Sequence, residues 1–192
     1  TYHKIKSLMY RAPDLYHQLL DKLTDAVSEH LEMQVSAGAD AVQLFDSWAG
    51  ELSPADFDSF ALPYVRRIVE RVSSTGANII YYINGMGNLV ERMKASGAHV
   101  LGVDWRLELA EVRRRAGEST VVQGNLDPGA LFGPPQEIRR RTFAMLDQTG
   151  GVGHIANLGH GLDPLTPLEG IQAFVDAVHE WPGMEGQAEH GQ

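Results

Sequence analysis

Short apolar segments alternate with amphipathic segments along most of this chain. The apolar segments have the length of buried strands and lie at residues 39–45, 78–83, 99–103, 120–124 and 153–158. The segments between them carry apolar residues at the spacing of one helix face. This spacing predicts helices at 54–74, 88–97, 107–117, 135–150 and 168–181, with one more at 14–38 ahead of the first strand. The chain is therefore predicted to contain five strand–loop–helix units.

Residues at the predicted helix ends support these boundaries. Ser53 precedes Pro54, which is the order expected for a helix N-cap followed by the first helical position. Gly38, Gly97 and Gly117 each follow an amphipathic run. Glycine is the residue that most often ends a helix, because it adopts left-handed backbone angles without steric cost.

Strands separated by helices pair in parallel, and both faces of such a sheet are buried. Two folds meet this requirement, an open doubly wound sheet and a TIM barrel. No glycine-rich phosphate fingerprint follows the first strand, which weakens the nucleotide-binding version of the open sheet. The predicted fold class is therefore α/β, a (β/α)8 TIM barrel of which this chain holds about five units. A whole barrel takes about 250 residues.

Polar side chains follow the strands, at the edge of a barrel where active sites lie. These candidates are Asp46, Ser47, Trp48, Asn84, Asp104, Trp105, Arg106, Asn125, Asp127, Asn157 and His160. Each also has a structural interpretation. Aspartate and asparagine after a strand often cap a helix or hold a turn. The tryptophans are more often packing residues than substrate platforms, and Arg106 can pair with a neighbouring carboxylate.

His160 is the strongest of these candidates. It lies in a loop between Gly159 and Gly161, and glycine allows both unusual backbone angles and the close approach of another group. Histidine is the side chain whose unperturbed pKa lies closest to neutral pH, so this residue type can donate a hydrogen bond or a proton to an acidic substrate. The competing interpretation is a loop histidine bonded to a carbonyl group. The segment "INGMGN" (83–88) is a weaker candidate for anion binding, because no Lys-Ser/Thr pair follows it.

Composition limits the remaining function classes. The formal net charge of −9 argues against binding to nucleic acids or anionic membranes, since phosphate contacts require Lys and Arg. The chain has no cysteine, which removes disulfides and every zinc site that needs sulfur. No apolar run approaches the roughly 18 residues of a membrane span. These features suit a cytoplasmic protein, and no two histidines have a convincing metal-binding spacing.

Five motifs together resemble uroporphyrinogen decarboxylases: "GADAVQLFDSWAGELS", "FALPYVRRIV", "GVDWR", "VVQGNLDPGALF" and "IANLGHGLDPLTP". The resemblance covers the chain to about Trp181, in the order of the family. It implies a TIM-barrel homodimer in the cytoplasm that uses no cofactor and no metal. The implied reaction removes the carboxyl groups of the four acetate side chains of uroporphyrinogen III and gives coproporphyrinogen III, in haem and tetrapyrrole biosynthesis. The resemblance assigns Ser47 and His160 as residues that bind substrate carboxylates, and His160 also as a catalytic residue assisting proton transfer.

The resemblance also implies that part of the site is missing. The arginines, the central pyrrole-binding aspartate and the substrate-contacting tyrosine of the family fall before Thr1, and neither Asp46 nor Asp104 matches that aspartate. We therefore expect residues 1–181 to form the carboxy-terminal part of a barrel domain that is inactive alone, with 182–192 as a disordered tail. Two alternatives remain. One is a zinc-dependent cobamide or thiol methyltransferase of the same superfamily, and the other is a non-catalytic half-barrel module.

Overall fold

The structure is a computed structural model of the 192-residue chain, and it describes residues 2–183. The predicted disordered tail lies outside the described residues from position 184 onward. Eight α-helices, three short 3-10 helices and five strands are present in the described part of the chain. They are α1 (His3–Arg11), α2 (Pro13–Ser36), β1 (Ala41–Asp46), η1 (Ala49–Glu51), α3 (Pro54–Phe60), α4 (Leu62–Ser73), β2 (Asn78–Ile83), η2 (Met86–Asn88), α5 (Val90–Ala95), β3 (Val100–Gly102), α6 (Leu109–Ala116), β4 (Val121–Leu126), η3 (Pro128–Phe132), α7 (Pro135–Asp147), β5 (His154–Leu158) and α8 (Leu168–Glu180).

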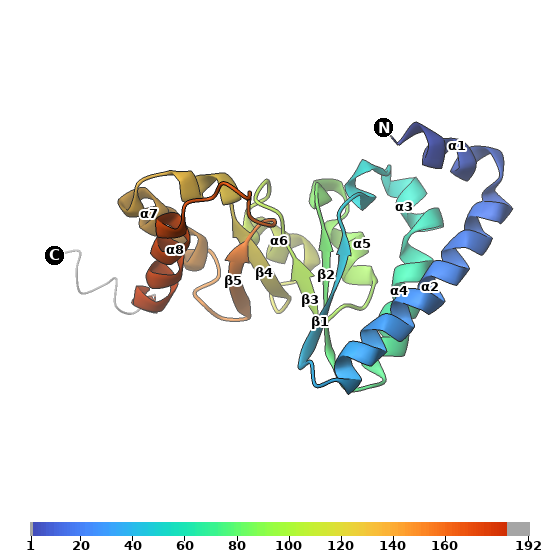
Figure 1. Ribbon diagram of the computed structural model, residues 1–192, viewed down its shortest axis with the longest axis horizontal. Coiled ribbons are helices and arrows are strands. Elements are labelled where there is room, and N and C mark those ends of the chain that lie inside the picture. The colour runs from blue at the N-terminus through green and yellow to red at the C-terminus, as the bar shows by residue number, and fades with distance from the viewer. Residues whose placement is uncertain (1, 184–192) are drawn as a thin grey trace.

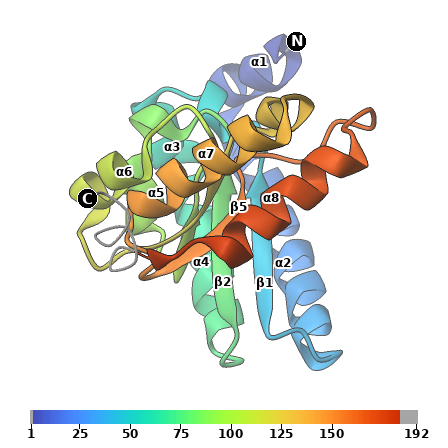
Figure 2. The same cartoon turned by 90° about the vertical axis from the view of Figure 1, so that its left-hand side faces the viewer.

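The five strands form one parallel sheet in the order β1-β2-β3-β4-β5. Each strand pairs with the strand that follows it in the sequence, with a helical connection between them. Helices α2 and α4 pack together beside β1, and α7 and α8 pack together at the β5 end (Figures 1 and 2). This succession of adjacent parallel units is the arrangement of a TIM barrel, and it confirms the predicted fold class.

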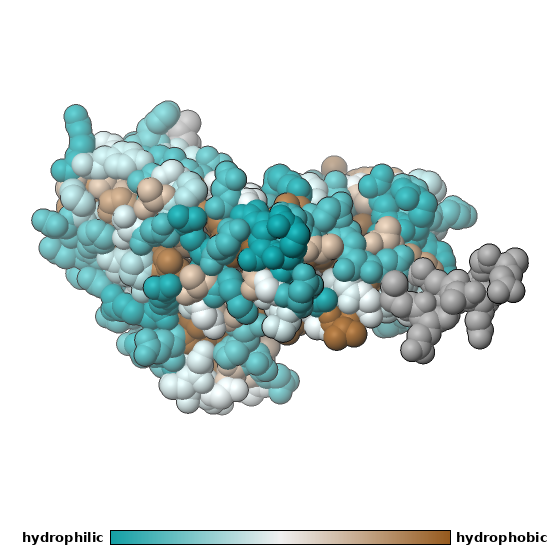
Figure 3. All heavy atoms as spheres, turned by 180° about the vertical axis from the view of Figure 1, so that it is seen from behind, coloured by the Kyte–Doolittle hydropathy of each residue, from teal (hydrophilic) through white to brown (hydrophobic). Residues whose placement is uncertain are grey.

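The two faces of the sheet differ in composition. On β2, Ile79, Tyr81 and Ile83 belong to the main hydrophobic core, whereas the intervening Tyr82 points to the opposite, concave face. That face also carries a polar contact between β1 and β4, in which Gln123 Nε2 donates to Gln43 Oε1 at 3.1 Å. On the side of the molecule seen in Figure 3, the surface is largely hydrophilic with small apolar areas.

The predicted helix at 54–74 is divided into α3 and α4 at Ala61. Its start is as predicted, because the Ser53 hydroxyl accepts a hydrogen bond from the Asp56 amide at 3.1 Å. The break has a local cause. Pro63 lies in the first turn of α4, and a proline inside a helix removes a hydrogen bond and clashes with the carbonyl four residues before it, so a continuous helix through this point is disfavoured.

Other boundaries move by a few residues. A separate helix, α1, precedes α2, and Ala12 interrupts them immediately before Pro13. Strand β4 runs to Leu126, so that Asn125 lies in the strand rather than in the loop after it. The predicted glycine stops are confirmed at Gly38, Gly97 and Gly117, where φ is +105°, +85° and +102°. No helix within residues 2–183 is long and apolar enough to cross a membrane.

Candidate active site

The loops that follow the strands meet at one edge of the sheet, the upper edge in Figure 1. Because all five strands are parallel, their carboxyl ends face the same way. The structure therefore brings together several of the predicted polar residues. It does so around the loops after β2, β3 and β5, with His160 among them.

The imidazole of His160 lies against two aromatic rings. Its centroid is 5.8 Å from that of Tyr82 and 6.3 Å from that of Trp105, and the ring planes differ by only 22° and 16°. Tyr82 comes from the concave face of β2, and Trp105 comes from the loop after β3. The His160 side chain is exposed and has no hydrogen-bond partner within the described residues. The structure thus holds the ring by stacking and leaves its nitrogens available to a ligand.

Gly159 brings this loop close to the loop after β3. A Cβ atom on Gly159 would lie 2.5 Å from the backbone nitrogen of Trp105 and 3.1 Å from the carbonyl carbon of Asp104. The Gly159 amide also donates to the Leu126 carbonyl at 2.7 Å. Gly161 has open space around it. The predicted close approach is therefore confirmed at Gly159 only. Neither glycine has a positive φ, so the unusual backbone angles that glycine allows are not found here.

Asp104 holds the neighbouring loops together. Its side chain is 1% exposed and accepts hydrogen bonds from the backbone amides of Gly85 and Arg106, the latter at 2.9 Å. It also pairs with the Arg106 guanidinium at 3.0 Å. This confirms the turn-holding interpretation of the aspartate and the pairing of Arg106 with a carboxylate.

Asparagine side chains have similar structural tasks. Asn125 Nδ2 donates to the carbonyls of Asp104 at 2.9 Å and Leu107 at 2.6 Å, and so ties β4 to the loop after β3. Asn84 Oδ1 accepts from Arg106 at 2.7 Å. Farther from His160, Asp127 caps η3 by accepting from the Gly129 amide at 2.8 Å, as the capping interpretation expects.

Ser47 is separate from this cluster. It lies in the turn between β1 and η1, is half-buried, and has no hydrogen-bond partner within residues 2–183. The next residue, Trp48, is 64% exposed and has its ring 5.6 Å from that of Tyr2. A line of rings connects the two regions, because Phe45 of β1 lies 5.7 Å from Tyr82, which stacks on His160.

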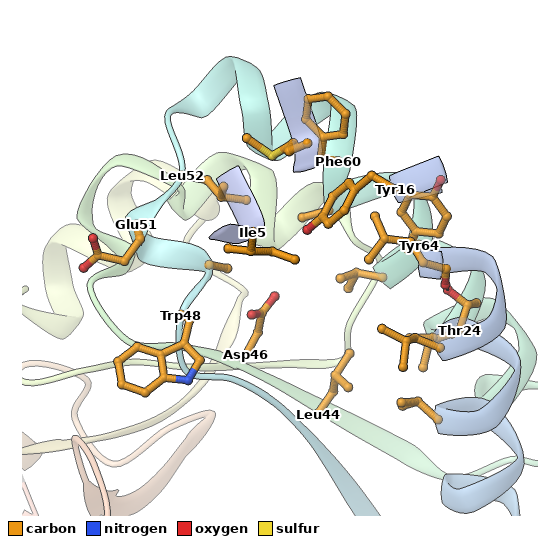
Figure 4. A pocket seen from close by; sticks show the side chains of 18 of the residues that line it. Ile5, Tyr16, Thr24, Leu44, Asp46, Trp48, Glu51, Leu52, Phe60 and Tyr64 are labelled. Carbon is orange, nitrogen blue, oxygen red and sulfur yellow. The ribbon is translucent and has the colours of Figure 1, made fainter. Parts of the chain in front are cut away.

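A cavity of about 490 Å³ lies beside β1, on the side of the sheet covered by α2 and α4 (Figure 4). Its lining is mainly apolar, and Asp46 points into it (Figure 4). Burial raises the pKa of the Asp46 carboxyl, while the Tyr81 hydroxyl opposes this by donating to it at 3.0 Å. The lining contains no residue of the loops after β3 and β5, so this cavity is distinct from the surroundings of His160.

The sequence interpretation missed Tyr82. The alternation of side chains along β2 could have indicated it, because Tyr81 and Tyr82 must point to opposite faces of the strand. Burial raises the pKa of Tyr82 to about 12, with a further contribution from the nearby Asp104 carboxylate. The hydroxyl therefore stays protonated at neutral pH and donates to the Gly159 carbonyl at 2.8 Å.

Metal-binding groups are sparse in this part of the molecule. The sequence has no cysteine. Within residues 2–183, no three histidine, aspartate or glutamate side chains gather in an arrangement that could hold a metal ion.

The fold and the loop cluster define a class of protein, an α/β protein of the TIM-barrel type with its candidate site at the carboxyl ends of the strands. The family profile described as uroporphyrinogen decarboxylase (URO-D) matches residues 1–181. The chain belongs to the uroporphyrinogen decarboxylase family.

Individual relatives agree with this assignment. The chain is 45% identical over 182 residues to a uroporphyrinogen decarboxylase of Nostoc punctiforme, an alignment that covers 94% of this chain and 52% of the relative. It is 44% identical over 176 residues to a chloroplastic uroporphyrinogen decarboxylase of Zea mays, covering 91% of this chain and 45% of the relative. The chain thus spans about half the length of the curated relatives it matches.

A solved structure shares the fold. A methyltransferase from Methanosarcina mazei superposes with a TM-score of 0.82 and is 27% identical, covering 92% of this chain and 53% of that one. The identity is lower than to the decarboxylases, which favours the decarboxylase branch.

Proposed function

We propose that this chain contributes the Ser47 and His160 loops to a uroporphyrinogen decarboxylase, which converts the four acetate side chains of uroporphyrinogen III to methyl groups. The observation that carries the proposal is the exposed imidazole of His160, held between Tyr82 and Trp105 at the carboxyl ends of the strands. Family membership supplies the substrate class.

The proposed reaction needs an electron sink and a proton donor. Protonation of a pyrrole ring carbon makes the ring cationic. The bond between the acetate methylene and its carboxylate then breaks, CO2 leaves, and the electron pair forms an exocyclic double bond to the ring. Protonation of that methylene and loss of the proton from the ring carbon give the methyl group and restore the pyrrole. These reaction steps need no oxidant or reductant, since the net change replaces CO2 by a proton.

His160 and Ser47 have different proposed roles in this reaction. The imidazole donates a hydrogen bond to the reacting carboxylate and assists proton transfer, because its ring nitrogens can both donate and accept a proton. The Ser47 hydroxyl, which is unpaired within the described residues, donates to a second carboxylate. A homodimeric state and a cytoplasmic location are part of the same proposal and rest on the family alone.

The test is turnover of uroporphyrinogen III by the protein made from its native gene, with the porphyrins separated after oxidation. We expect His160→Asn to slow decarboxylation by about 100-fold, the size typical of a lost general acid–base group. His30→Asn is the matched control, because His30 lies exposed on α2 and its hydrogen bond within residues 2–183 is to Gln34, at 2.8 Å. Unchanged rates for all four steps in His160→Asn would remove His160 from the proposal.

A methyltransferase is the second candidate, and the superposition on the Methanosarcina mazei protein is the observation that favours it. The zinc-dependent version needs sulfur and imidazole ligands, and this chain offers no cysteine. Stoichiometric zinc in the purified protein, together with methyl transfer to a thiol, would favour this candidate over the decarboxylase.

A further inference from the structure

The charge of Arg106 distinguishes it from the other residues in the loops at the carboxyl edge of the sheet. These loops comprise residues 46–53, 84–89, 103–108, 127–134 and 159–167, all within the described part of the chain, and Arg106 is their sole arginine or lysine. The chain as a whole carries a net charge of −9. Among the residues of these loops, an anionic ligand therefore finds two side chains that can bear positive charge, Arg106 and His160.

The Arg106 guanidinium is fixed by groups from two loops. Its Nη1 atom donates to Asn84 Oδ1 at 2.7 Å and to Asp104 Oδ2 at 3.0 Å. The Asp104 side chain is itself held by two backbone amides. The orientation of the guanidinium is thus set before a ligand binds, which lowers the entropic cost of binding.

One edge of the guanidinium stays open. Nε and Nη2 have no hydrogen-bond partner among residues 2–183, and the side chain is 51% exposed. The Nε and Nη2 hydrogens are parallel, and this edge matches the two oxygens of a carboxylate.

Arg106 is also adjacent to the proposed catalytic histidine. Its guanidinium carbon lies 3.9 Å from the centroid of the Trp105 ring, and the same indole stacks on His160. One aromatic ring thus contacts both groups, which places Arg106 and His160 in the same part of the carboxyl edge of the sheet.

We propose that Arg106 is a substrate-binding residue that holds a propionate carboxylate while the neighbouring acetate reacts near His160. This inference rests on the proposed function for the identity of the ligand. Each pyrrole of uroporphyrinogen carries one acetate and one propionate, and the propionates persist through all four decarboxylations. Arg106 therefore contributes to binding of the substrate and of every intermediate, and it contributes equally to the ground state and the transition state.

The test compares steady-state kinetics of Arg106→Gln, Arg106→Lys and the parent protein made from its native gene. We expect Arg106→Gln to raise KM about tenfold with kcat within about twofold, the pattern of lost uniform binding. Arg106→Lys keeps the charge but loses the planar fork, and should raise KM by about threefold. Arg114→Gln is the matched control, because that side chain is 68% exposed and its hydrogen bonds within residues 2–183 are to Glu111 of its own helix. An unchanged KM in both Arg106 variants would overturn the inference.

A second measurement separates this inference from the proposed function. Fluorescence titration with uroporphyrin, the stable oxidised octacarboxylate, reports binding without turnover. Decarboxylation by the parent with an unchanged KM in the Arg106 variants overturns the role of Arg106 and leaves the proposed function standing. Uroporphyrin binding that depends on Arg106, without decarboxylation by the parent, supports the carboxylate site and overturns the enzymatic proposal. A parent protein that neither binds nor decarboxylates overturns both. If Arg106→Gln does not fold, as judged by its thermal transition, Arg106→Lys decides the outcome.

Discussion

The Tyr82 hydroxyl donates a hydrogen bond to the Gly159 carbonyl, and its ring lies parallel to the imidazole of the next residue, His160. One side chain on β2 therefore holds the loop after β5 in two ways. The contact spans 77 positions of the sequence and joins the second strand to the loop after the fifth. It sets the place of His160 above the concave face of the sheet.

Loss of the Tyr82 hydroxyl should loosen this loop. Tyr82→Phe keeps the ring and leaves the Gly159 carbonyl without its donor. We expect the free energy of unfolding to fall by about 1 kcal/mol, the typical net value of a hydrogen bond. Amide hydrogen exchange within 157–162 should also become faster. Urea unfolding and exchange measured by mass spectrometry check the two effects.

Tyr10→Phe is the control for this variant, because the Tyr10 hydroxyl donates to Asp56 at an exposed site. We expect it to change the free energy of unfolding by less than about 0.5 kcal/mol. Unaltered exchange in 157–162 for Tyr82→Phe would show that the hydroxyl does not hold the loop.

The two glycines beside His160 should respond differently to alanine. In Gly159→Ala the new Cβ meets the backbone of Trp105 at 2.5 Å, and backbone atoms cannot move aside without shifting a loop. We expect a loss of about 1–3 kcal/mol in the free energy of unfolding, the range of overpacking. Gly161→Ala, with open space and no positive φ, should stay within about 0.5 kcal/mol of the parent. Urea unfolding of both variants checks this, and equal stabilities would contradict the close approach.

His154 should make stability depend on pH. Its Nε2 donates to the Gly124 carbonyl at 2.6 Å, and its Nδ1 lies 2.9 Å from the Thr149 hydroxyl. Burial lowers the pKa of this imidazole below its usual value, and nearby Arg113 lowers it further, against the opposing effect of the Gly124 carbonyl. The unfolded chain therefore binds the proton more tightly. The stabilisation is fully present above the unfolded pKa of about 6.5 and is lost as pH falls from there through the folded pKa.

The expected result is a lower free energy of unfolding at pH 5.5 than at pH 7.5, with a smaller difference in His154→Gln. Urea unfolding at both pH values measures this. His30→Gln, at an exposed position of α2, should keep the pH dependence of the parent. Equal pH dependence in His154→Gln and the parent would show that another group is responsible.

Much of the secondary structure was predictable because its signals are local. The period of apolar positions identified all five strands, and the glycine stops and the Ser53 cap were correct. The errors were local as well, because α1 was not predicted and the helix predicted at 54–74 is interrupted near Pro63. Helical periodicity continues across such a break, so the pattern of apolar positions does not reveal it.

The site was predictable only in part. Its location after the strands follows from parallel pairing, and His160 follows from its loop and the family motif. Asp104 and Asn125 had two interpretations each, and their hydrogen bonds favour the structural one. The roles of Tyr82 and of the open edge of Arg106 can be recognised only from their contacts with other loops.

The sequence by itself determined the order of strands and helices, the parallel sheet and the family, because these depend on the spacing of residues and on short motifs. Only the tertiary structure decided that His160 stacks between Tyr82 and Trp105, that Gly159 is required for close approach, and that Arg106 is oriented by Asp104. Such contacts depend on strand register and sheet curvature, which bring together residues far apart in the chain. Neither the register nor the curvature can be read from the local pattern of hydrophobic and polar positions.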